Sequence, residues 1–69
     1  MLAALLRWRA GTAQAAGIGE AVVVADRTLA AIATRRPTGV AELADVPGLG
    51  PVKAARYGAD LVAIVAGTG

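Results

Sequence analysis

Cysteine and histidine are both absent from this chain of 69 residues, which limits how so short a protein can be stabilised. A domain of this size gains only roughly 3–5 kcal/mol from its core, so many small domains add disulfides or a structural metal ion. Without cysteine no disulfide forms, and without either residue type the usual zinc sites are excluded. We therefore expect the packing of regular secondary structure to provide the stability, with no metal ion and no cofactor.

The same two absences argue against an enzyme. A Cys nucleophile and a His general base or triad are excluded, because their functional groups are missing. The five carboxylates are spread along the chain without a ligand-like spacing: Glu20, Asp26, Glu42, Asp45 and Asp60. We predict a domain without catalytic activity of its own.

Alanine explains why 57% of the residues are hydrophobic. The chain has 18 Ala against 8 Val, 7 Leu and 3 Ile, and Ala is a strong helix former. Unbroken apolar stretches are short, such as residues 21–25 and 61–66, whereas a membrane-spanning helix needs about 20 apolar residues. The apolar residues 2–6 precede the first arginines, which is not the order of a signal peptide. We expect no membrane association and a cytoplasmic location.

The apolar spacing predicts a first helix over residues 2–16. One of its faces combines Leu2, Leu5, Leu6, Ala13 and Ala16, with Trp8 at the edge. Gly17 is suited to end this helix in a left-handed conformation, and residues 17–19 then form a turn.

Arg9 interrupts the apolar face of this helix, because it lies between Leu5 and Ala13. Burying an unpaired charge is unfavourable. We therefore predict that Arg9 pairs with a carboxylate or with helix-terminal carbonyl groups, and so joins the first helix to a later segment. The candidate carboxylates are Asp26, Asp45 and Asp60.

A buried connection and a second long helix are predicted to follow. Residues 21–25 form one apolar run, and a single strand cannot make a sheet, so we expect an irregular or short helical segment there. Asp26 is a suitable N-cap for a helix over residues 27–35, which Pro37 stops. The residues of this helix expected to face inward are Leu29, Ile32 and Ala33.

A short third helix is predicted after Pro37, with Thr38 or Gly39 as its cap. If Gly39 is the cap, Glu42 occupies the third helical position and can reach back as half of a capping box. The residues expected to face inward here are Val40, Leu43 and Val46.

The segment 46–51, Val-Pro-Gly-Leu-Gly-Pro, predicts a tight hairpin that leads into another helix. Pro51 suits the first turn of that helix, where its missing N–H is not needed. We expect this helix to break at Gly58. A last helix over residues 60–66 is expected to precede a frayed tail at residues 67–69.

Two groups of residues carry a resemblance to a known family. Leu6-Arg7-Trp8-Arg9 stands near the start of the chain. The second group comprises Arg36-Pro37-Thr38, Glu42-Leu43, Val46-Pro47-Gly48-Leu49-Gly50-Pro51, Lys53 and Tyr57-Gly58. Their order and spacing resemble the HRDC domain, the helicase and RNase D C-terminal domain, over about residues 2 to 66. Helix-hairpin-helix modules share the hairpin alone, so the joint pattern is what distinguishes the family.

The resemblance implies an all-α fold, a compact five-helix bundle that contains a helix-hairpin-helix-like turn. HRDC domains are non-catalytic accessory modules of RecQ-type helicases, UvrD-type helicases and RNase D-like exonucleases, and they contact DNA, RNA or neighbouring domains. We therefore expect a single HRDC-like domain over residues 1–69, monomeric by itself. The parent protein that we expect is a RecQ- or UvrD-type DNA helicase.

Candidate contacts with nucleic acid include the hairpin. The backbone N–H groups of Gly48 and Gly50 can hold a phosphate, and Lys53 and Arg56 on the following helix can add ionic contacts. The alternative is a purely structural turn with Leu49 packed inward.

A positive patch that joins Arg7 to Arg35 and Arg36 is the second candidate. Such a patch contacts phosphates without reading the sequence. Arg35 and Arg36 are equally well explained as helix-end residues that suit the helix dipole. Trp8 and Tyr57 are interpreted as packing residues, like the structural Arg9.

The net charge of +2 permits nucleic-acid binding without requiring it. Our first hypothesis is weak, non-sequence-specific binding of single-stranded or forked DNA by an accessory domain of a helicase. The alternative is a docking module that contacts the remaining domains of its parent protein through alanine-rich outer faces. The alanines expected on such faces include Ala10, Ala15, Ala54 and Ala55. The sequence leaves open the parent enzyme and the choice between DNA and RNA.

Overall fold

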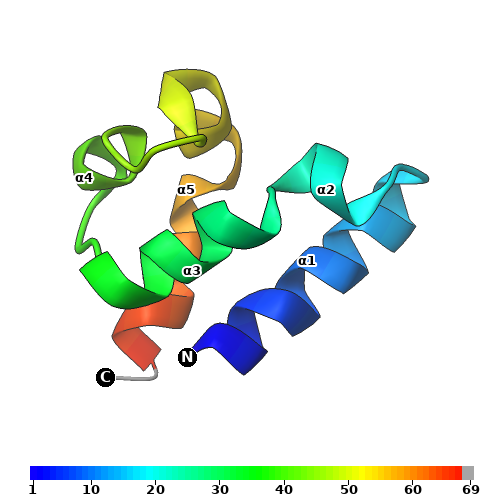
Figure 1. Cartoon of the computed structure of the whole chain (residues 1–69), viewed down its shortest axis with the longest axis horizontal. Coiled ribbons are helices and arrows are strands. Elements are labelled where there is room, and N and C mark those ends of the chain that lie inside the picture. The colour runs from blue at the N-terminus through cyan, green and yellow to red at the C-terminus, as the bar shows by residue number, and fades with distance from the viewer. Residues whose placement is uncertain (68–69) are drawn as a thin grey trace.

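Residues 1–67 are described by the computed structural model of this protein, and over that range the chain forms five helices and no strand. In chain order the helices are α1 (Leu2–Ala16), α2 (Glu20–Val23), α3 (Asp26–Arg35), α4 (Val40–Ala44) and α5 (Gly50–Gly67). Figure 1 shows their arrangement, coloured along the chain. The all-α fold class and the five-helix architecture expected from the sequence are confirmed.

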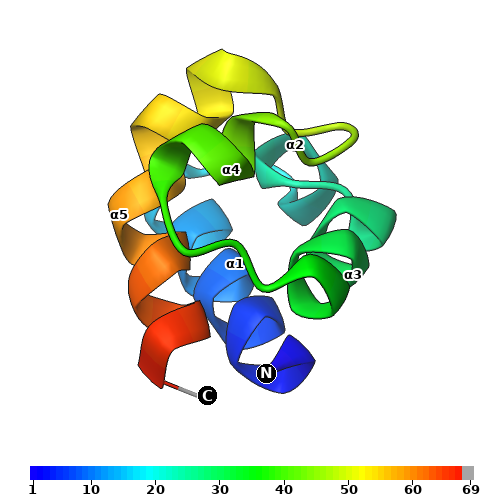
Figure 2. The same cartoon turned by 90° about the vertical axis from the view of Figure 1, so that its left-hand side faces the viewer.

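The helices surround one core. α3 and α5 lie on opposite sides of the molecule, with α1 and α4 on the two sides between them (Figure 1 and Figure 2). Every helix contributes to the buried apolar cluster, which consists of Leu5, Ala13, Val23, Val24, Leu29, Ile32, Leu43, Val46, Leu49, Ala54, Leu61 and Val65. Removal of these aliphatic side chains from water is the main stabilising contribution that a chain without cysteine can use.

α1 ends as expected, but its buried face differs from the expected one. Gly17 takes a left-handed conformation with φ 68°, and the N–H groups of Gly17 and Ile18 donate to Gln14 and Ala13, the pattern of a Schellman motif. The buried residues of the helix are Leu5, Arg9 and Ala13. Of the apolar face that the sequence indicated, Leu5 and Ala13 are buried, whereas Leu2, Leu6 and Ala16 are exposed, because α2 and α3 approach the stripe that is centred on Arg9.

The segment between α1 and α3 is a short helix followed by extended backbone. α2 ends at Val23, and Val24 is extended, with both valines buried. α3 begins one residue earlier than expected, with Ala25 as its N-cap. The prediction that Asp26 is the cap is therefore wrong. Asp26 lies in the first turn instead, and its carboxylate accepts a hydrogen bond from Arg9.

α4 begins after Gly39, which resolves the choice between Thr38 and Gly39. Glu42 is the third helical residue, as expected, but it reaches back to Thr38: Oε1 accepts from the hydroxyl at 2.8 Å and Oε2 from the backbone N–H at 3.2 Å. Leu43 is buried, as expected. Val40 was expected to face inward but is 45% exposed, and the part of its side chain that is covered packs against Gly58 of α5.

α5 is one continuous helix, so the expected break at Gly58 is wrong. A glycine inside a helix is unfavourable by only roughly 0.5–1 kcal/mol relative to Ala, which tertiary packing can offset. Here a Cβ on Gly58 would lie 2.9 Å from Cγ2 of Val40, so the missing side chain allows α4 to approach closely. Gly67 also belongs to α5, and the rest of the expected frayed tail, residues 68 and 69, lies outside the described residues.

The alanines divide between the core and the surface. Ala10, Ala15 and Ala55 are exposed, as expected for outer faces, but Ala54 is completely buried. Ala54 was placed wrongly because it lies one turn before Gly58 on the face of α5 that α4 covers. Over residues 1–67, no helix combines the length and the apolar character that crossing a bilayer requires.

Candidate nucleic-acid interface

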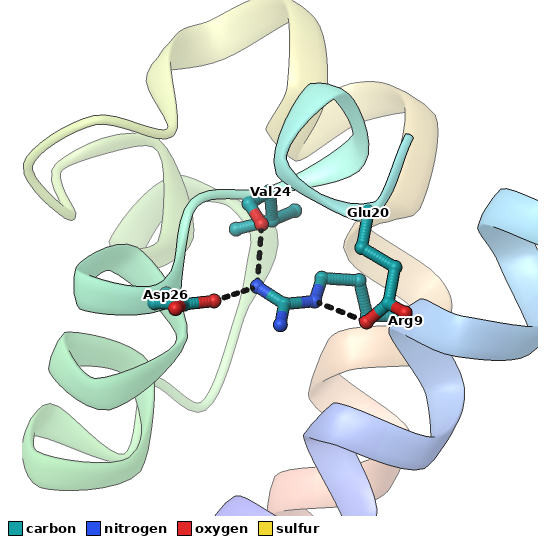
Figure 3. Close-up of polar contacts among 4 residues, drawn as sticks. All are labelled: Arg9, Glu20, Val24 and Asp26. Atoms are coloured by element: carbon teal, nitrogen blue, oxygen red, sulfur yellow. Dashed lines mark hydrogen bonds and ion pairs between the residues drawn. The ribbon is translucent and has the colours of Figure 1, made fainter. Parts of the chain in front are cut away.

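A cluster of four residues joins α1 to α2 and α3 (Figure 3). Arg9 is only 6% exposed, and its Nη1 donates to the carbonyl of Val24 at 3.0 Å and to Oδ1 of Asp26 at 2.6 Å. Its Nε lies 3.4 Å from Oε1 of Glu20, an ion pair without hydrogen-bond geometry. We call Arg9, Glu20, Val24 and Asp26 the Arg9 clamp. The expected pairing with Asp26 is present, and Glu20 adds a partner that the sequence did not suggest.

The clamp changes the balance of charge on the surface. The side chain of Glu20 is 54% exposed and that of Asp26 is 88% exposed, so the cation is desolvated while its counter-charges remain hydrated. One cation and two carboxylates give the clamp a net charge of −1. The six other cations and three other carboxylates of the chain therefore carry a net charge of +3, more than the overall +2.

An aromatic pair connects α1 to α5. The rings of Trp8 and Tyr57 meet edge to face, with centroids 5.3 Å apart and planes at 77°. Nε1 of Trp8 also donates to Oδ2 of Asp60 at 3.2 Å, one turn further along α5 than Tyr57. Both rings are half-buried and pack against the core. These contacts support the interpretation of both as packing residues, and they hold the indole in one orientation.

Two arginines flank this aromatic pair. The guanidinium carbon of Arg56 lies 5.6 Å from the centroid of the Tyr57 ring, a cation–π arrangement. Arg7 lines a shallow groove between α1 and α5 together with Trp8 and Asp60. The structure thus brings Arg7 and Arg56, which the sequence assigned to different groups, to one pair of rings.

Arg35 and Arg36 are exposed at the end of α3. Arg35 lines a second depression with Pro37, Glu42 and Asp45, so two carboxylates oppose its charge. Arg36 takes a left-handed backbone conformation, φ 52°, where it caps the helix. The groove that contains Arg7 and the depression that contains Arg35 share no lining residue, and the patch that joins these arginines stays a prediction.

The hairpin has few backbone donors to offer a phosphate. The N–H groups of Val46 and Leu49 donate to Leu43 and Val46, and Pro47 and Pro51 carry none. The remaining N–H groups of the hairpin belong to its two glycines, Gly48 and Gly50, which have φ values of 87° and 76°. Leu49 is buried, as the alternative interpretation of a structural turn expects.

Gly48 also has a packing role that the sequence did not reveal. A Cβ at this position would lie 2.5 Å from Oγ1 of Thr28, and the same hydroxyl donates to the carbonyl of Pro47 at 3.3 Å. The hairpin therefore contacts α3 directly. This contact places Arg27 beside Pro47 and Gly48, in a third depression. Arg27 was missed because only the tertiary contact brings it near the hairpin.

Lys53 has a partner within the fold. Its Nζ donates to the carbonyl of Val22 at 3.1 Å, near the end of α2. A cation near the last carbonyls of a helix interacts favourably with the helix dipole, so this contact helps to hold α2 against α5.

Among residues 1–67, no three Asp, Glu, His or Cys side chains gather closely enough to hold a metal ion.

The match to a family model decides the affiliation of the chain. The model described as the HRDC domain matches residues 1–65. The chain belongs to the HRDC domain family. The resemblance based on Leu6–Arg9, the hairpin and their spacing is thereby confirmed.

This HRDC domain is also similar to part of three curated helicases. It is 40% identical over 67 residues to the "ATP-dependent DNA helicase UvrD2" of Mycobacterium bovis (strain ATCC BAA-935 / AF2122/97) and to proteins of the same name from two Mycobacterium tuberculosis strains, CDC 1551 / Oshkosh and ATCC 25618 / H37Rv. The match covers 97% of this chain and 10% of each helicase, so the chain spans about a tenth of the length of these relatives. No solved structure matches the chain significantly.

Membership of the HRDC family supports a non-catalytic, accessory role. Three consecutive residues of α1 face different neighbours. Arg7 lines the groove, Trp8 contacts α5, and Arg9 contacts α2 and the start of α3. One short stretch of the HRDC domain therefore positions three of its other helices.

Proposed function

We propose that this HRDC domain is an accessory part of a longer ATP-dependent DNA helicase, in which it holds single-stranded or forked DNA weakly and without reading its sequence. The similarity to UvrD2 supports the parentage, because those relatives are DNA helicases of which this chain spans a tenth. The surface charge outside the Arg9 clamp supports the contact with DNA, because phosphates attract an excess of exposed arginines.

The single observation that carries the DNA contact is the exposure of five arginines outside the Arg9 clamp, where the chain has three carboxylates. They are Arg7, Arg27, Arg35, Arg36 and Arg56. Contacts with phosphates position a strand but carry no base information. Because Glu42, Asp45 and Asp60 lie among these arginines, we expect weak binding that keeps a strand near the motor domains rather than anchoring it.

Fluorescence anisotropy with labelled single-stranded and forked DNA tests this proposal. For about three phosphate contacts, the logarithm of the binding constant should fall against the logarithm of salt concentration with a slope of about −2 on single strands. The double variants Arg7→Ala/Arg56→Ala and Arg35→Ala/Arg36→Ala should each bind more weakly. Gln14→Ala, an exposed and uncharged control on α1, should bind like the unaltered domain.

Absence of any binding at low salt would reject the contact with DNA. A strand of the same sequence made of RNA separates a preference for DNA from general binding of nucleic acid. An unchanged affinity in both double variants would show that the exposed arginines are not the contacts.

The docking alternative has one observation in its favour. Val22 on α2 and Val52 on α5 are 62% and 78% exposed, and the hydrogen bond from Lys53 to Val22 brings their helices together. Exposed apolar side chains that gather on one surface mark contacts with other proteins. Gel filtration of the domain mixed with the rest of its helicase, without DNA, should give a complex that Val22→Ser/Val52→Ser weakens. Gln14→Ser is the control.

A further inference from the structure

The groove between α1 and α5 has features that neither the packing of the core nor a diffuse positive surface explains. It is a shallow, open groove lined mainly by α1, and the indole of Trp8 forms part of its wall. We propose that this groove binds one unpaired nucleotide of a single strand, with the base stacked on Trp8 and the flanking phosphates held by Arg7 and Arg56. The inference rests on the proposed function and names the site at which a base is held.

The orientation of Trp8 makes it a prepared stacking surface. The edge-to-face contact with Tyr57 and the hydrogen bond to Asp60 fix the ring at two points, while part of the indole still lines the groove. A base that stacks on a fixed ring loses less free energy to ordering than one that stacks on a mobile ring. Stacking on aromatic side chains also tolerates any base, which suits a domain that does not read sequence.

The floor of the groove leaves space beside the ring. α1 contributes the small residues Gly11, Thr12 and Ala15 to it, and a Cβ built on Gly11 meets no atom within 4 Å. A larger residue at position 11 therefore projects into the groove without contacting the core. This property allows the groove to be filled without disturbing the fold.

Two cations beside the aromatic pair suit the phosphates on either side of a stacked base. Arg7 lines the groove itself. Arg56 does not line it, but its guanidinium lies over the ring of Tyr57, which contacts Trp8. Asp60 opposes a phosphate, but its Oδ2 already accepts from the indole. Asp60→Asn retains an acceptor and removes the charge, so we expect this variant to bind a strand about twofold more tightly.

Trp8 is the only tryptophan of the chain, so its fluorescence reports on this groove alone. The probe is an unlabelled oligodeoxythymidine of about ten nucleotides, a length typical of single-strand sites. We expect the oligonucleotide to quench the Trp8 emission along the same binding curve that anisotropy gives with a labelled strand.

Filling the groove should abolish this signal and weaken binding. In Gly11→Gln the quenching should disappear and the affinity should fall by about fivefold or more, the loss expected from one stacked base. Ala10→Gln adds the same side chain at the neighbouring exposed position, which does not line the groove. It should change neither the quenching of Trp8 nor the affinity for the strand. Circular dichroism checks that both variants remain helical.

The possible results separate the site from the proposed function. If anisotropy shows binding but Trp8 is not quenched, or Gly11→Gln binds as tightly as Ala10→Gln, the nucleotide site is overturned and the proposed contact with DNA remains. If no strand binds at low salt, both are overturned. Quenching that only Gly11→Gln removes, with the matching loss of affinity, supports the site.

Discussion

Two regions of this HRDC domain hold a helix against its neighbours through different kinds of contact. α1 is joined to α2 and α3 by the Arg9 clamp, in which a buried guanidinium contacts two exposed carboxylates and a backbone carbonyl. α5 packs closely against α4, and the hairpin packs closely against α3, because a glycine at each contact has no side chain. There Gly58 lies against Val40, and Gly48 lies against Thr28.

The two regions tolerate different substitutions. The Arg9 clamp is stable only while its carboxylates carry their charges. The contacts of Gly48 and Gly58 are stable only while these residues have no side chain, because a Cβ would meet the neighbouring helix. The α1–α5 groove belongs to neither kind of contact, because a Cβ added to Gly11 would meet no atom within 4 Å. Stability and binding can therefore be altered separately in this domain, and the following variants test the comparison.

The largest effect is expected from neutralising the two counter-ions of the clamp. Glu20→Gln with Asp26→Asn keeps the shape of both side chains but leaves the buried Arg9 without a counter-charge. Breaking a fully buried ion pair is typically unfavourable by about 3–5 kcal/mol, and because these carboxylates are 54% and 88% exposed we expect a smaller loss, about 2 kcal/mol. We expect the free energy of unfolding, measured by urea denaturation and circular dichroism, to fall by about that amount.

Arg9→Met is the matched comparison, and it should be less harmful. It removes the cation itself, so that both hydrated carboxylates stay in water and only the carbonyl of Val24 loses a partner. Loss of one such hydrogen bond is unfavourable by about 1–3 kcal/mol, and we expect the lower end because Met packs well in its place. An Arg9→Met variant less stable than the double carboxylate variant would show that the hydrogen bond, not the charge, dominates.

The hairpin should give the next largest effect. Gly48→Ala combines a left-handed backbone with a close contact to Thr28, and such strain is unfavourable by about 1–3 kcal/mol. Gly50→Ala has a similar backbone conformation but open space, so it should lose less stability. Urea denaturation of both variants measures the difference, and Thr28→Ala should recover part of the loss in the Gly48→Ala background only. An equal loss of stability in Gly48→Ala and Gly50→Ala would show that the contact with Thr28 does not contribute to the effect.

These contrasts also show what the sequence could predict. Helical periodicity predicted the helices, and the conformational preferences of Gly17 and Pro51 predicted where α1 ends and how α5 begins. The pairing of Arg9 with Asp26 was foreseeable because a buried cation needs a carboxylate and the chain has only five. These features depend on local sequence or, for Arg9, on the small number of carboxylates available to pair with it.

The errors arise where one residue type has two uses that look alike in sequence. A glycine can break a helix or admit a neighbouring helix, and Gly58 does the second. Ala54 and Ala55 are chemically identical, and only the position of α4 decides that one is buried. The candidate site was predicted least well. Arg7 lies near the aromatic pair, and Arg27 near the hairpin, only because the helices pack together.

The smallest expected effects compare two glycines inside helices. Gly11→Ala adds a methyl group in open space, so it should stabilise the domain by about 0.5–1 kcal/mol through helix propensity. Gly58→Ala gains the same propensity but places its methyl group 2.9 Å from Val40, and overpacking of this kind is unfavourable by about 1–3 kcal/mol. We therefore expect a net loss of about 1 kcal/mol at Gly58, measured by urea denaturation, and recovery when Val40→Ala is added. If both glycine variants are stabilising, then Val40 moves aside freely, and α4 and α5 do not depend on the missing side chain.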